Sequence, residues 1–338
     1  MTQGFTQPFT GHGGSLDAAR AWFGARPDHG PECWIDLSTG INPHAWPSPW
    51  REAEPLEIDW RRLPEESELR ALETVAAAHF GLSPDHVCAV PGTELGMRMV
   101  GEMIAAPAFH LAPAYRTHGE MIADSRPLAR EAIDEADGAS LILANPNNPD
   151  GHLFDSETLF GLLARRGEGW LIVDEAFADT HPRQSVARAI ADDCPLIVLR
   201  SFGKFFGLAG ARVGFVLGPR PLLARLRRRM GAWPISAGAL TLARAAYADT
   251  DWIADMRDRL ADDADRLDAV LRTHGLSPRG ACPLFRLVET PQAGVLFERL
   301  ARQGILTRPF AEHPDRLRFG LAADESELAR LDRALRHG

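Results

Sequence analysis

The sequence predicts an α/β protein: a mostly parallel sheet with helices on both faces, followed by a smaller α+β lobe. Between residues 87 and 217, short continuous apolar runs alternate with helical segments. Such runs are typical of parallel strands that are buried on both faces. Beyond about residue 221, long amphipathic segments give way to short strand-like pieces. At 338 residues, the chain is long enough for two lobes.

The large lobe is expected to contain six strands. The apolar runs that predict them cover 87–90, 108–111, 140–144, 170–174, 196–200 and 212–217. Pockets in such sheets lie outside the carboxyl ends of the strands. Asn145, Asp174 and Ser201 each lie at or just beyond the end of a run, so we expect the functional site there.

Hydrophobic periodicity predicts the helices. Apolar residues at helical spacing cover 67–80, 221–230, 239–274 and 325–336, and Ser67 is a possible N-cap of the first helix. A glycine turn at Gly92 opens a further helix that is expected to run through Ile104. We therefore expect an N-terminal arm over 1–41 that joins the small lobe, a large domain over 42–220, and a small α+β domain over 221–338.

Composition argues against several classes of protein. The net charge is −9, and no run of Lys and Arg marks a nucleic-acid surface. No apolar run is long enough to span a bilayer, and no signal-peptide pattern is visible at the N-terminus. Cys33, Cys88, Cys194 and Cys282 are far apart and form no Cys-x-x-Cys pair. We therefore expect free thiols, a cytoplasmic location and no metal site.

One lysine, Lys204, stands in an apolar, glycine-rich run between Ser201 and Phe215. Apolar surroundings lower the pKa of a lysine amine and make it a nucleophile, as a Schiff base requires. The Ser201 hydroxyl and the Arg212 guanidinium flank this amine in sequence and are suited to hold a phosphate beside it. The alternative is an ordinary strand-to-helix turn whose lysine reaches solvent.

This spacing resembles the lysine segment of the fold type I pyridoxal-phosphate (PLP) enzymes, the aspartate aminotransferase superfamily. The resemblance covers nearly the whole chain, with six matching parts in the expected order. It implies that Lys204 carries PLP and that Ser201 and Arg212 bind its phosphate. Asp174 matches the aspartate that keeps the pyridine nitrogen protonated, so that the ring acts as an electron sink. Read alone, Asp174 could equally be a helix N-cap.

Three further parts of the cofactor site follow from the resemblance. Asn148, in Asn-Pro-Asn-Asn-Pro-Asp-Gly, matches a donor to the phenolic oxygen of the cofactor, although turn chemistry also explains this segment. Thr93 and Glu94 match residues that hold the phosphate at a helix N-terminus. Tyr115 matches the aromatic residue that stacks on the pyridine ring, and its alternative is an ordinary half-buried tyrosine.

The resemblance also implies the substrate residues. Arg318 matches the arginine that binds the α-carboxylate, and Arg308 matches a position that meets a substrate phosphate. His12 and Asn42 are expected to line the same pocket. For each of these residues, a plain surface or turn position is the alternative.

Two departures from the family pattern stand out. Phe177 occupies a place where many aminotransferases of this class have a tyrosine, and a phenylalanine cannot donate a hydrogen bond. Leu63-Pro64 replaces a Tyr-Pro pair whose tyrosine reaches the site of the partner subunit in histidinol-phosphate aminotransferases. We expect a homodimer, as is usual in the family, but this particular contact stays open.

Three segments, 12–14, 36–43 and 174–177, together resemble the threonine-phosphate decarboxylases of cobalamin biosynthesis. The resemblance implies conversion of L-threonine O-3-phosphate to (R)-1-amino-2-propanol O-2-phosphate and CO₂. One alternative is an aminotransferase for histidinol phosphate or a similar phosphorylated amino acid. Another is the aminotransferase-like sensor domain of a transcription regulator. The acidic net charge and the glycine-rich arm, in place of a helix-turn-helix, argue against that second alternative.

Overall fold

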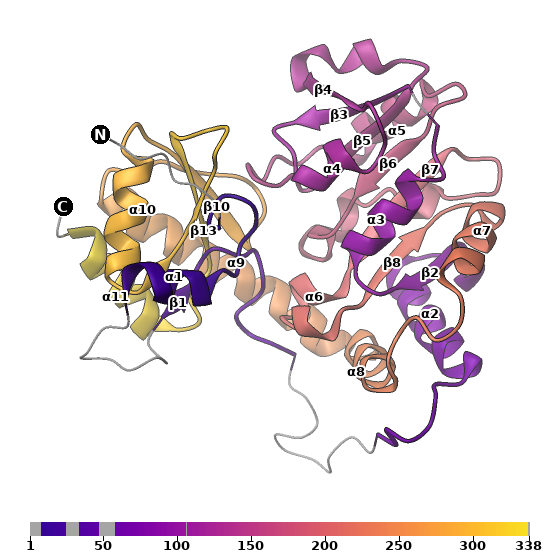
Figure 1. Cartoon of the computed structure of the whole chain (residues 1–338), viewed down its shortest axis with the longest axis horizontal. Helices are drawn as coiled ribbons and strands as arrows, with labels where there is room; N and C mark the ends of the chain where they lie inside the picture. The colour runs from indigo at the N-terminus through magenta and orange to yellow at the C-terminus, as the bar shows by residue number, and fades with distance from the viewer. Residues whose placement is uncertain (1–7, 25–33, 47–57, 106, 337–338) are drawn as a thin grey trace. The chain divides into compact units, whose positions relative to one another are not determined.

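The computed structural model describes residues 8–24, 34–46, 58–105 and 107–336 (Figure 1). The chain forms two compact units. The first unit contains Met1–His44, Pro149–Gly151 and Asp258–Gly338, and the second contains Ala45–Asn148 and His152–Arg257. The division therefore falls inside helix α9 (Thr250–Thr273), not at residue 220. The reason is that the two helices before α9, which are α7 (Arg220–Met230) and α8 (Ala237–Ala248), pack on elements of the second unit.

A seven-stranded sheet forms the core of the second unit, with the order β2-β8-β7-β6-β5-β3-β4. The bounds are β2 (Val87–Val90), β3 (Ala108–Ala112), β4 (Arg126–Ala129), β5 (Ser140–Ala144), β6 (Leu171–Asp174), β7 (Leu196–Ser201) and β8 (Gly214–Leu217). β3 to β7 run parallel, whereas β8 is antiparallel to both of its neighbours. The expected α/β fold is confirmed. The edge strand β4 was not expected, because only one of its four residues is buried and it contains a proline.

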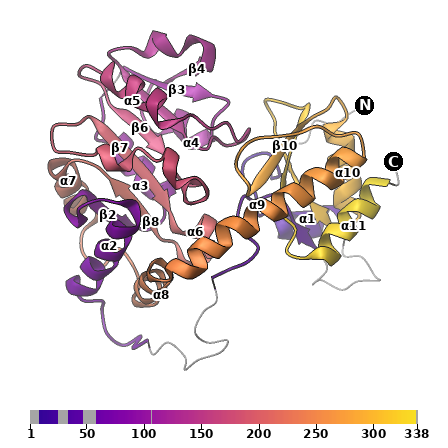
Figure 2. The ribbon, with the colours of Figure 1, turned by 180° about the vertical axis from the view of Figure 1, so that it is seen from behind.

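Helices cover both faces of this sheet (Figures 1 and 2). Val216 faces the apolar cluster formed with α3 (Thr93–Gly101) and α7 (Arg220–Met230). Phe215, one residue earlier, points to the other face, where its ring contacts Phe80 of α2. The remaining helices of this unit are α2 (Glu66–Phe80), α4 (Arg116–Glu120), α5 (Ser156–Ala164), α6 (Phe202–Phe205) and α8 (Ala237–Ala248), and α8 packs on α2.

Strand register brings the expected site residues to one edge. Ala144 is paired with Asp174, Asp174 with Leu199, and Ser201 with Gly214. The carboxyl ends of β5, β6 and β7 therefore lie side by side. The loops that follow these three strands carry the asparagine, aspartate and lysine segments identified from the sequence.

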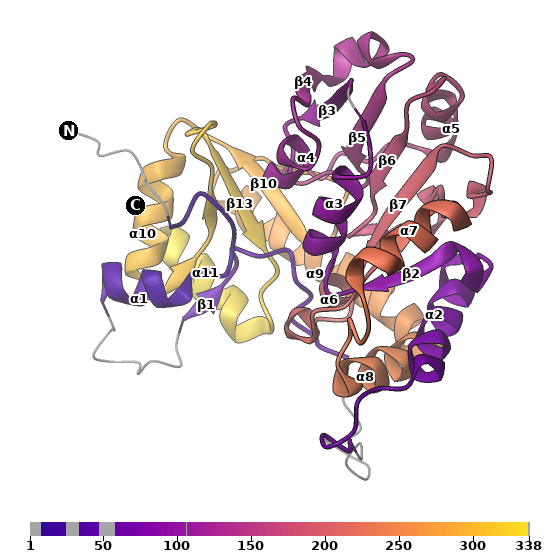
Figure 3. The same cartoon turned by 45° about the vertical axis from the view of Figure 1, so that its right-hand side comes forward.

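The first unit is built on a four-stranded antiparallel sheet with the order β12-β13-β10-β9 (Figure 3). Its strands are β9 (Pro278–Arg279), β10 (Phe285–Glu289), β12 (Arg308–Pro309) and β13 (Arg316–Gly320). A parallel pair, β1 (Ile35–Asp36) with β11 (Ile305–Leu306), ties the N-terminal arm to this unit. Its helices are α1 (Leu16–Phe23), α10 (Ala293–Arg302), α11 (Glu325–Arg336) and the second part of α9.

Several helix ends differ from the expectation. The N-cap of α2 is Glu65, which forms a capping box with Glu68, so Ser67 lies inside the first turn. The expected helix over 239–274 is two helices, because Asp249 ends α8 and its carboxylate accepts from the Trp252 N–H at 3.1 Å. α3 ends at Gly101, where the Met121 carbonyl approaches the helix backbone too closely for any Cβ.

Three of the four cysteines, Cys88, Cys194 and Cys282, are free thiols, and Cys33 lies outside the described residues. Within the described ranges, no cluster of His, Cys, Asp and Glu is arranged to hold a metal ion. The helices of that same part of the chain are too short or too polar to cross a membrane.

Candidate active site

Asp174 ends β6 with both carboxylate oxygens engaged. Oδ1 accepts from the Ala176 N–H at 3.0 Å, and Oδ2 lies 3.0 Å from Nε2 of His118. Asp174 is 6% exposed and His118 is fully buried, so the contact is shielded from water. A buried carboxylate held in this way is fixed in orientation and suited to pair with a protonated ring nitrogen.

The N-terminus of α3 and the Arg212 side chain lie together. The N-cap is Gly92 (φ 85°), and a Cβ there would lie 2.6 Å from Nη2 of Arg212. Gly214 packs as closely against this helix end, since a Cβ added at Gly214 would lie 2.5 Å from the Thr93 nitrogen. The first N–H groups of a helix have no partner within the helix, and a glycine N-cap offers no side chain to them. This arrangement of amides and a guanidinium fits a phosphate group.

Lys204 lies on the four-residue helix α6, directly after β7. Its Nζ is 5.7 Å from the centre of the Phe177 ring, so Phe177 and Lys204 lie side by side at the strand ends. Phe202 and Phe205, which flank the lysine, are fully buried. The lysine itself is half-buried, between segments whose phenylalanine side chains are anchored in the core.

Glu94 positions the tyrosine of the site. Its carboxylate accepts from the Tyr115 hydroxyl at 3.1 Å and from the Thr117 hydroxyl at 2.9 Å, and it pairs with Arg98 at 2.8 Å. Burial, followed by the charge of Glu94, raises the pKa of Tyr115. Because the Glu94 carboxylate is occupied in this way, the backbone N–H is the group of this residue that is suited to a phosphate.

Asn148 lies in the turn after β5. The preceding asparagines hold this loop: Asn145 exchanges hydrogen bonds with the backbone of Phe154 at 2.8 and 3.1 Å, and Asn147 donates to the Pro113 carbonyl at 2.9 Å. These two side chains therefore fix the loop that carries Asn148.

In the first unit, the two arginines are direct cross-strand neighbours. Arg308 of β12 is paired with Arg318 of β13, so their side chains leave the sheet on the same side. Both are buried. Arg308 donates to the Gly11 carbonyl at 3.1 Å, and Arg318 donates to the Ser38 carbonyl at 2.7 Å. Burial, followed by the charge of Arg308, lowers the pKa of Arg318.

His12 and Asn42 lie on the arm that carries these carbonyls. His12 is exposed between Gly11 and Gly13, and a Cβ at Gly13 would lie 2.4 Å from the Ser38 oxygen. His12 is thus next in sequence to Gly11, which accepts from Arg308, and to Gly13, which packs against Ser38. Asn42 is buried, and its Oδ1 accepts from the His44 N–H at 2.8 Å in a local turn. That hydrogen bond gives Asn42 a structural role whether or not it meets a ligand.

His118 was not identified from the sequence. The usable signal was its spacing: it follows Tyr115 by three residues, which places both on one side of the short helix α4, and their rings are 5.9 Å apart. This spacing alone does not indicate a functional role for His118. The role is suggested only by its contact with Asp174, which is 56 residues later in the sequence.

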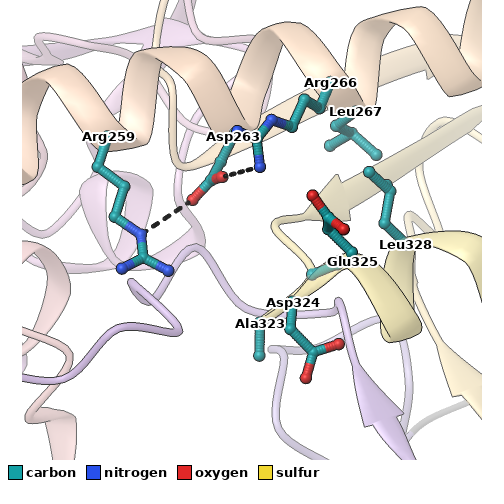
Figure 4. A pocket seen from close by; sticks show the side chains of 9 residues that line it. Arg259, Asp263, Arg266, Leu267, Ala323, Asp324, Glu325 and Leu328 are labelled. Carbon is teal, nitrogen blue, oxygen red and sulfur yellow. Dashed lines mark ion pairs between the residues drawn. The ribbon is translucent and has the colours of Figure 1, made fainter.

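A cavity of about 240 Å³ lies in the first unit between α9 and the start of α11, and none of the predicted site residues lines it. Figure 4 shows Arg259 and Arg266 of α9 turned toward Asp263, at 3.8 and 3.7 Å. Asp324 and Glu325 line the opposite side. The arginines are thus already paired with a carboxylate, and the lining has two arginines and three carboxylates, so it offers no unpaired cation to an anionic ligand.

The aminotransferase class I and II family matches residues 128–335. The chain is 41% identical over 337 residues to a threonine-phosphate decarboxylase of Pseudomonas aeruginosa, covering 96% of each chain. It is 39% identical over 335 residues to another, from a Sinorhizobium species, covering 96% of this chain and 97% of the relative. A histidinol-phosphate aminotransferase from Sinorhizobium meliloti, solved in complex with pyridoxal-5'-phosphate, superposes with a TM-score of 0.82 at 22% identity, covering 98% of this chain and 94% of that one.

Proposed function

The chain belongs to the aminotransferase class I and II family, and we propose that it decarboxylates L-threonine O-3-phosphate with PLP as cofactor. The products are (R)-1-amino-2-propanol O-2-phosphate and CO₂, and the reaction serves cobalamin biosynthesis. The enzyme is thus a PLP-dependent lyase on an aminotransferase fold. Similarity to the two decarboxylases over nearly the whole chain supports this assignment over an aminotransferase.

One observation carries the choice of a phosphorylated amino acid: the cross-strand pair of Arg308 and Arg318. Like charges directly opposite each other on a sheet destabilise it. Burial increases that cost, because the charges lose water. Two anionic groups on one small molecule, a carboxylate and a phosphate, would offset it. We assign the carboxylate to Arg318, the more buried of the two, and the phosphate to Arg308.

We assign the cofactor to residues of the second unit. The α3 amides of Thr93 and Glu94, with Ser201 and Arg212, would hold its phosphate. Lys204 would hold it covalently, Asp174 would pair with the ring nitrogen, and Asn148 would donate to the phenolic oxygen. Tyr115 would stack on the ring. When bound, PLP withdraws electrons from the α-carbon of an amino acid and so weakens the bonds to that carbon.

The substrate residues decide which bond is broken. Decarboxylation requires the bond between the α-carbon and the carboxylate to be the one that is activated, so the group that orients the carboxylate also directs the reaction. We assign this function to Arg318, whose guanidinium is fixed by its hydrogen bond to the Ser38 carbonyl. The Lys204 amine is then suited to return a proton to the α-carbon.

We also propose that the protein is a cytoplasmic homodimer. The buried free thiols of Cys88 and Cys282 suit a reducing compartment. Trp60, Leu63 and Trp233 of the second unit are 71%, 57% and 59% exposed, and large exposed apolar side chains often mark protein contacts. Light scattering on the purified protein tests the assembly, and a monomer at micromolar concentration would contradict it.

The deciding experiment is a product assay. With L-threonine O-3-phosphate and PLP, and without any keto acid, we expect CO₂ and the phosphorylated aminopropanol. Mass spectrometry identifies both. A keto product that forms only with 2-oxoglutarate, from this substrate or from histidinol phosphate, would show an aminotransferase instead.

A further inference from the structure

Arg200, the residue before Ser201, is a buried cation of the second unit. It is 3% exposed, and its guanidinium bridges two carboxylates that are fully buried. Nη1 donates to Glu175 at 3.0 Å, and Nη2 donates to Asp179. The face of the Phe80 ring, whose centre is 4.6 Å from the guanidinium carbon, covers the remaining side. A charge cluster of this depth is held by its own ion pairs and not by solvent.

The cluster is attached to the cofactor residues proposed above at three places. Glu175 directly follows Asp174 on β6, and Arg200 directly precedes Ser201 on β7. The Thr93 hydroxyl donates to the Arg200 carbonyl at 3.0 Å. Arg200 thus ties together the ends of two neighbouring strands and the first residue of α3.

Other groups complete the cluster without replacing Arg200. On one carboxylate, the Ser185 hydroxyl and the Val186 N–H donate to Glu175 at 2.6 and 2.8 Å. On the other, His79 lies 2.8 Å from the Asp179 carboxylate, and Arg257 donates to the Asp179 carbonyl at 2.7 Å. Each carboxylate has its own local partners, and in the described part of the chain only Arg200 is bonded to both.

We propose that Arg200 is a positioning residue, whose guanidinium holds the ends of β6 and β7, and with them Asp174 and Ser201, at the spacing that the cofactor requires. This inference rests on the proposed function, since it concerns PLP binding. A guanidinium is suited to the role because its planar fork makes two directed contacts at once, whereas a lysine ammonium is a single point charge.

The second unit contains a matched control, Arg166. It is fully buried, and it donates to the carbonyls of Leu162, Ala136 and Ala139 at 2.8, 2.8 and 3.0 Å. It lies between α5 and β6, and Ala139 directly precedes β5, so its contacts are at the amino ends of these strands. Loss of Arg166 removes a buried cation from the same sheet, but from the edge away from the proposed cofactor residues.

The experiment compares Arg200→Met with Arg166→Met by titrating PLP into the cofactor-free proteins and following absorbance and thermal unfolding. We expect Arg200→Met to raise the dissociation constant of PLP by tenfold or more and to shift the absorption band of the bound cofactor. Arg166→Met should lower the unfolding temperature but keep the dissociation constant within twofold of wild type. Equal PLP affinities of the two variants, or a larger loss in Arg166→Met, would overturn the proposal.

Arg200→Lys replaces Arg200→Met in this titration if the Met variant is not recovered in folded form. It keeps the charge but cannot bridge both carboxylates, so an intermediate loss of PLP affinity is expected, and wild-type affinity would contradict the positioning role. The wild-type titration separates the two hypotheses. If wild-type protein does not bind PLP, the proposed function fails; if it binds PLP and the Arg200 variants bind equally well, only the present inference fails.

Discussion

Two groups of buried charge, one in each unit, are arranged in opposite ways, although the first unit also holds a matched pair, Arg286 with Asp268 at 2.7 Å. In the second unit, a buried cation faces anions: Arg200 lies between Glu175 and Asp179. The buried Asp174 carboxylate likewise has a polar side chain, His118, beside it. Both groups thus have partners within the chain, and in our proposal these contacts hold the strand ends in position.

In the first unit, a buried cation faces another cation. Arg308 and Arg318 are cross-strand partners, and their guanidinium groups donate to backbone carbonyls of the arm. Two cations side by side repel each other, although the charge of Asp36 also acts on Arg318. In our proposal, the residues that hold the cofactor site have opposite charges beside them, whereas the two arginines that bind the substrate have each other, and a bound anion would reduce their repulsion.

The largest effect is expected at Lys204, the residue that we place in the chemistry itself. Lys204→Ala should lower kcat by roughly 10²–10⁴-fold, the range typical for loss of a proton-transferring side chain. Borohydride reduction of wild-type holoenzyme, followed by peptide mapping, should find the cofactor on this lysine. A label on any other residue would show that the assignment is wrong.

Breaking the ion pairs of Arg200 with Glu175 and Asp179 should lower the free energy of unfolding by an amount that depends on pH. Burial favours a higher pKa for Asp179, but the charge of Arg200 and the hydrogen bond with His79 lower that pKa to about 2. A carboxyl group with a depressed pKa stabilises the folded state above its unfolded pKa, and this contribution is lost as pH falls through the folded value. Wild type therefore keeps the contribution of Asp179 down to acid pH.

Arg200→Met removes the main cause that lowers this pKa, so burial should raise the pKa of Asp179 above its unfolded value. We expect the variant to lose roughly 3–5 kcal/mol of unfolding free energy near neutral pH, because two buried carboxylates lose their cation. The loss should shrink as pH falls toward about 5, where the carboxylates take up protons. Urea unfolding at several pH values measures it, and a loss that grows on acidification would contradict the matched-charge account.

Asp174→Asn tests the second buried contact of this unit, the one between Asp174 and His118. The amide cannot keep a ring nitrogen protonated, so kcat should fall roughly 10²–10³-fold, the range seen when one preorganised electrostatic contact is removed. The fold should persist, because an amide oxygen can still accept from the Ala176 N–H. His118→Phe should have a smaller effect on kcat, as expected for a residue that acts through Asp174. If Asp174→Asn turns over at the wild-type rate, the only role left for Asp174 is to accept the backbone hydrogen bond from Ala176.

The smallest of these effects, and the most discriminating, concerns the two like charges. Loss of one charge-assisted contact weakens binding by roughly 1.5–3 kcal/mol, or about tenfold to a hundredfold. Arg308→Ala should lower kcat/KM for phosphothreonine much more than for threonine, whereas Arg318→Ala should lower both alike. Equal losses for the two substrates in Arg308→Ala would remove its phosphate role.

Local pattern was enough to predict most of the fold. Continuous apolar runs identified six of the strands, because a strand buried on both faces needs no polar alternation. The missed strand, β4, is an exposed edge whose pairing with β3 is set by the tertiary structure. The Ser67 N-cap was wrong because Glu65 with Glu68 made a capping box that fixed the helix start earlier.

Prediction of the candidate site had a different limit. Lys204, Asp174 and Ser201 could be proposed from the sequence because their segments have a recognisable spacing. His118 and Arg200 were not, because their roles depend on neighbours far away in sequence. The contact of His118 with Asp174 joins residues 56 apart, and the contact of Arg200 with Glu175 joins residues 25 apart. Contacts between residues so far apart cannot be predicted from a single sequence until the strand order is known.

The hydrogen bonds from Arg308 to Gly11 and from Arg318 to Ser38 join residues 297 and 280 apart. During synthesis the second unit is complete once residue 257 has been made, whereas the first unit needs both ends of the chain. Contacts over such distances close large loops and form late. The paired arginines should therefore be assembled after the strand ends that carry the proposed cofactor residues. Pulse-labelled hydrogen exchange during refolding should find protection in β5 to β7 before β12 and β13, and the reverse order would contradict this sequence of events. A chain that stops short of β13 would contain the proposed cofactor residues but lack Arg318, to which we assign the carboxylate of the substrate.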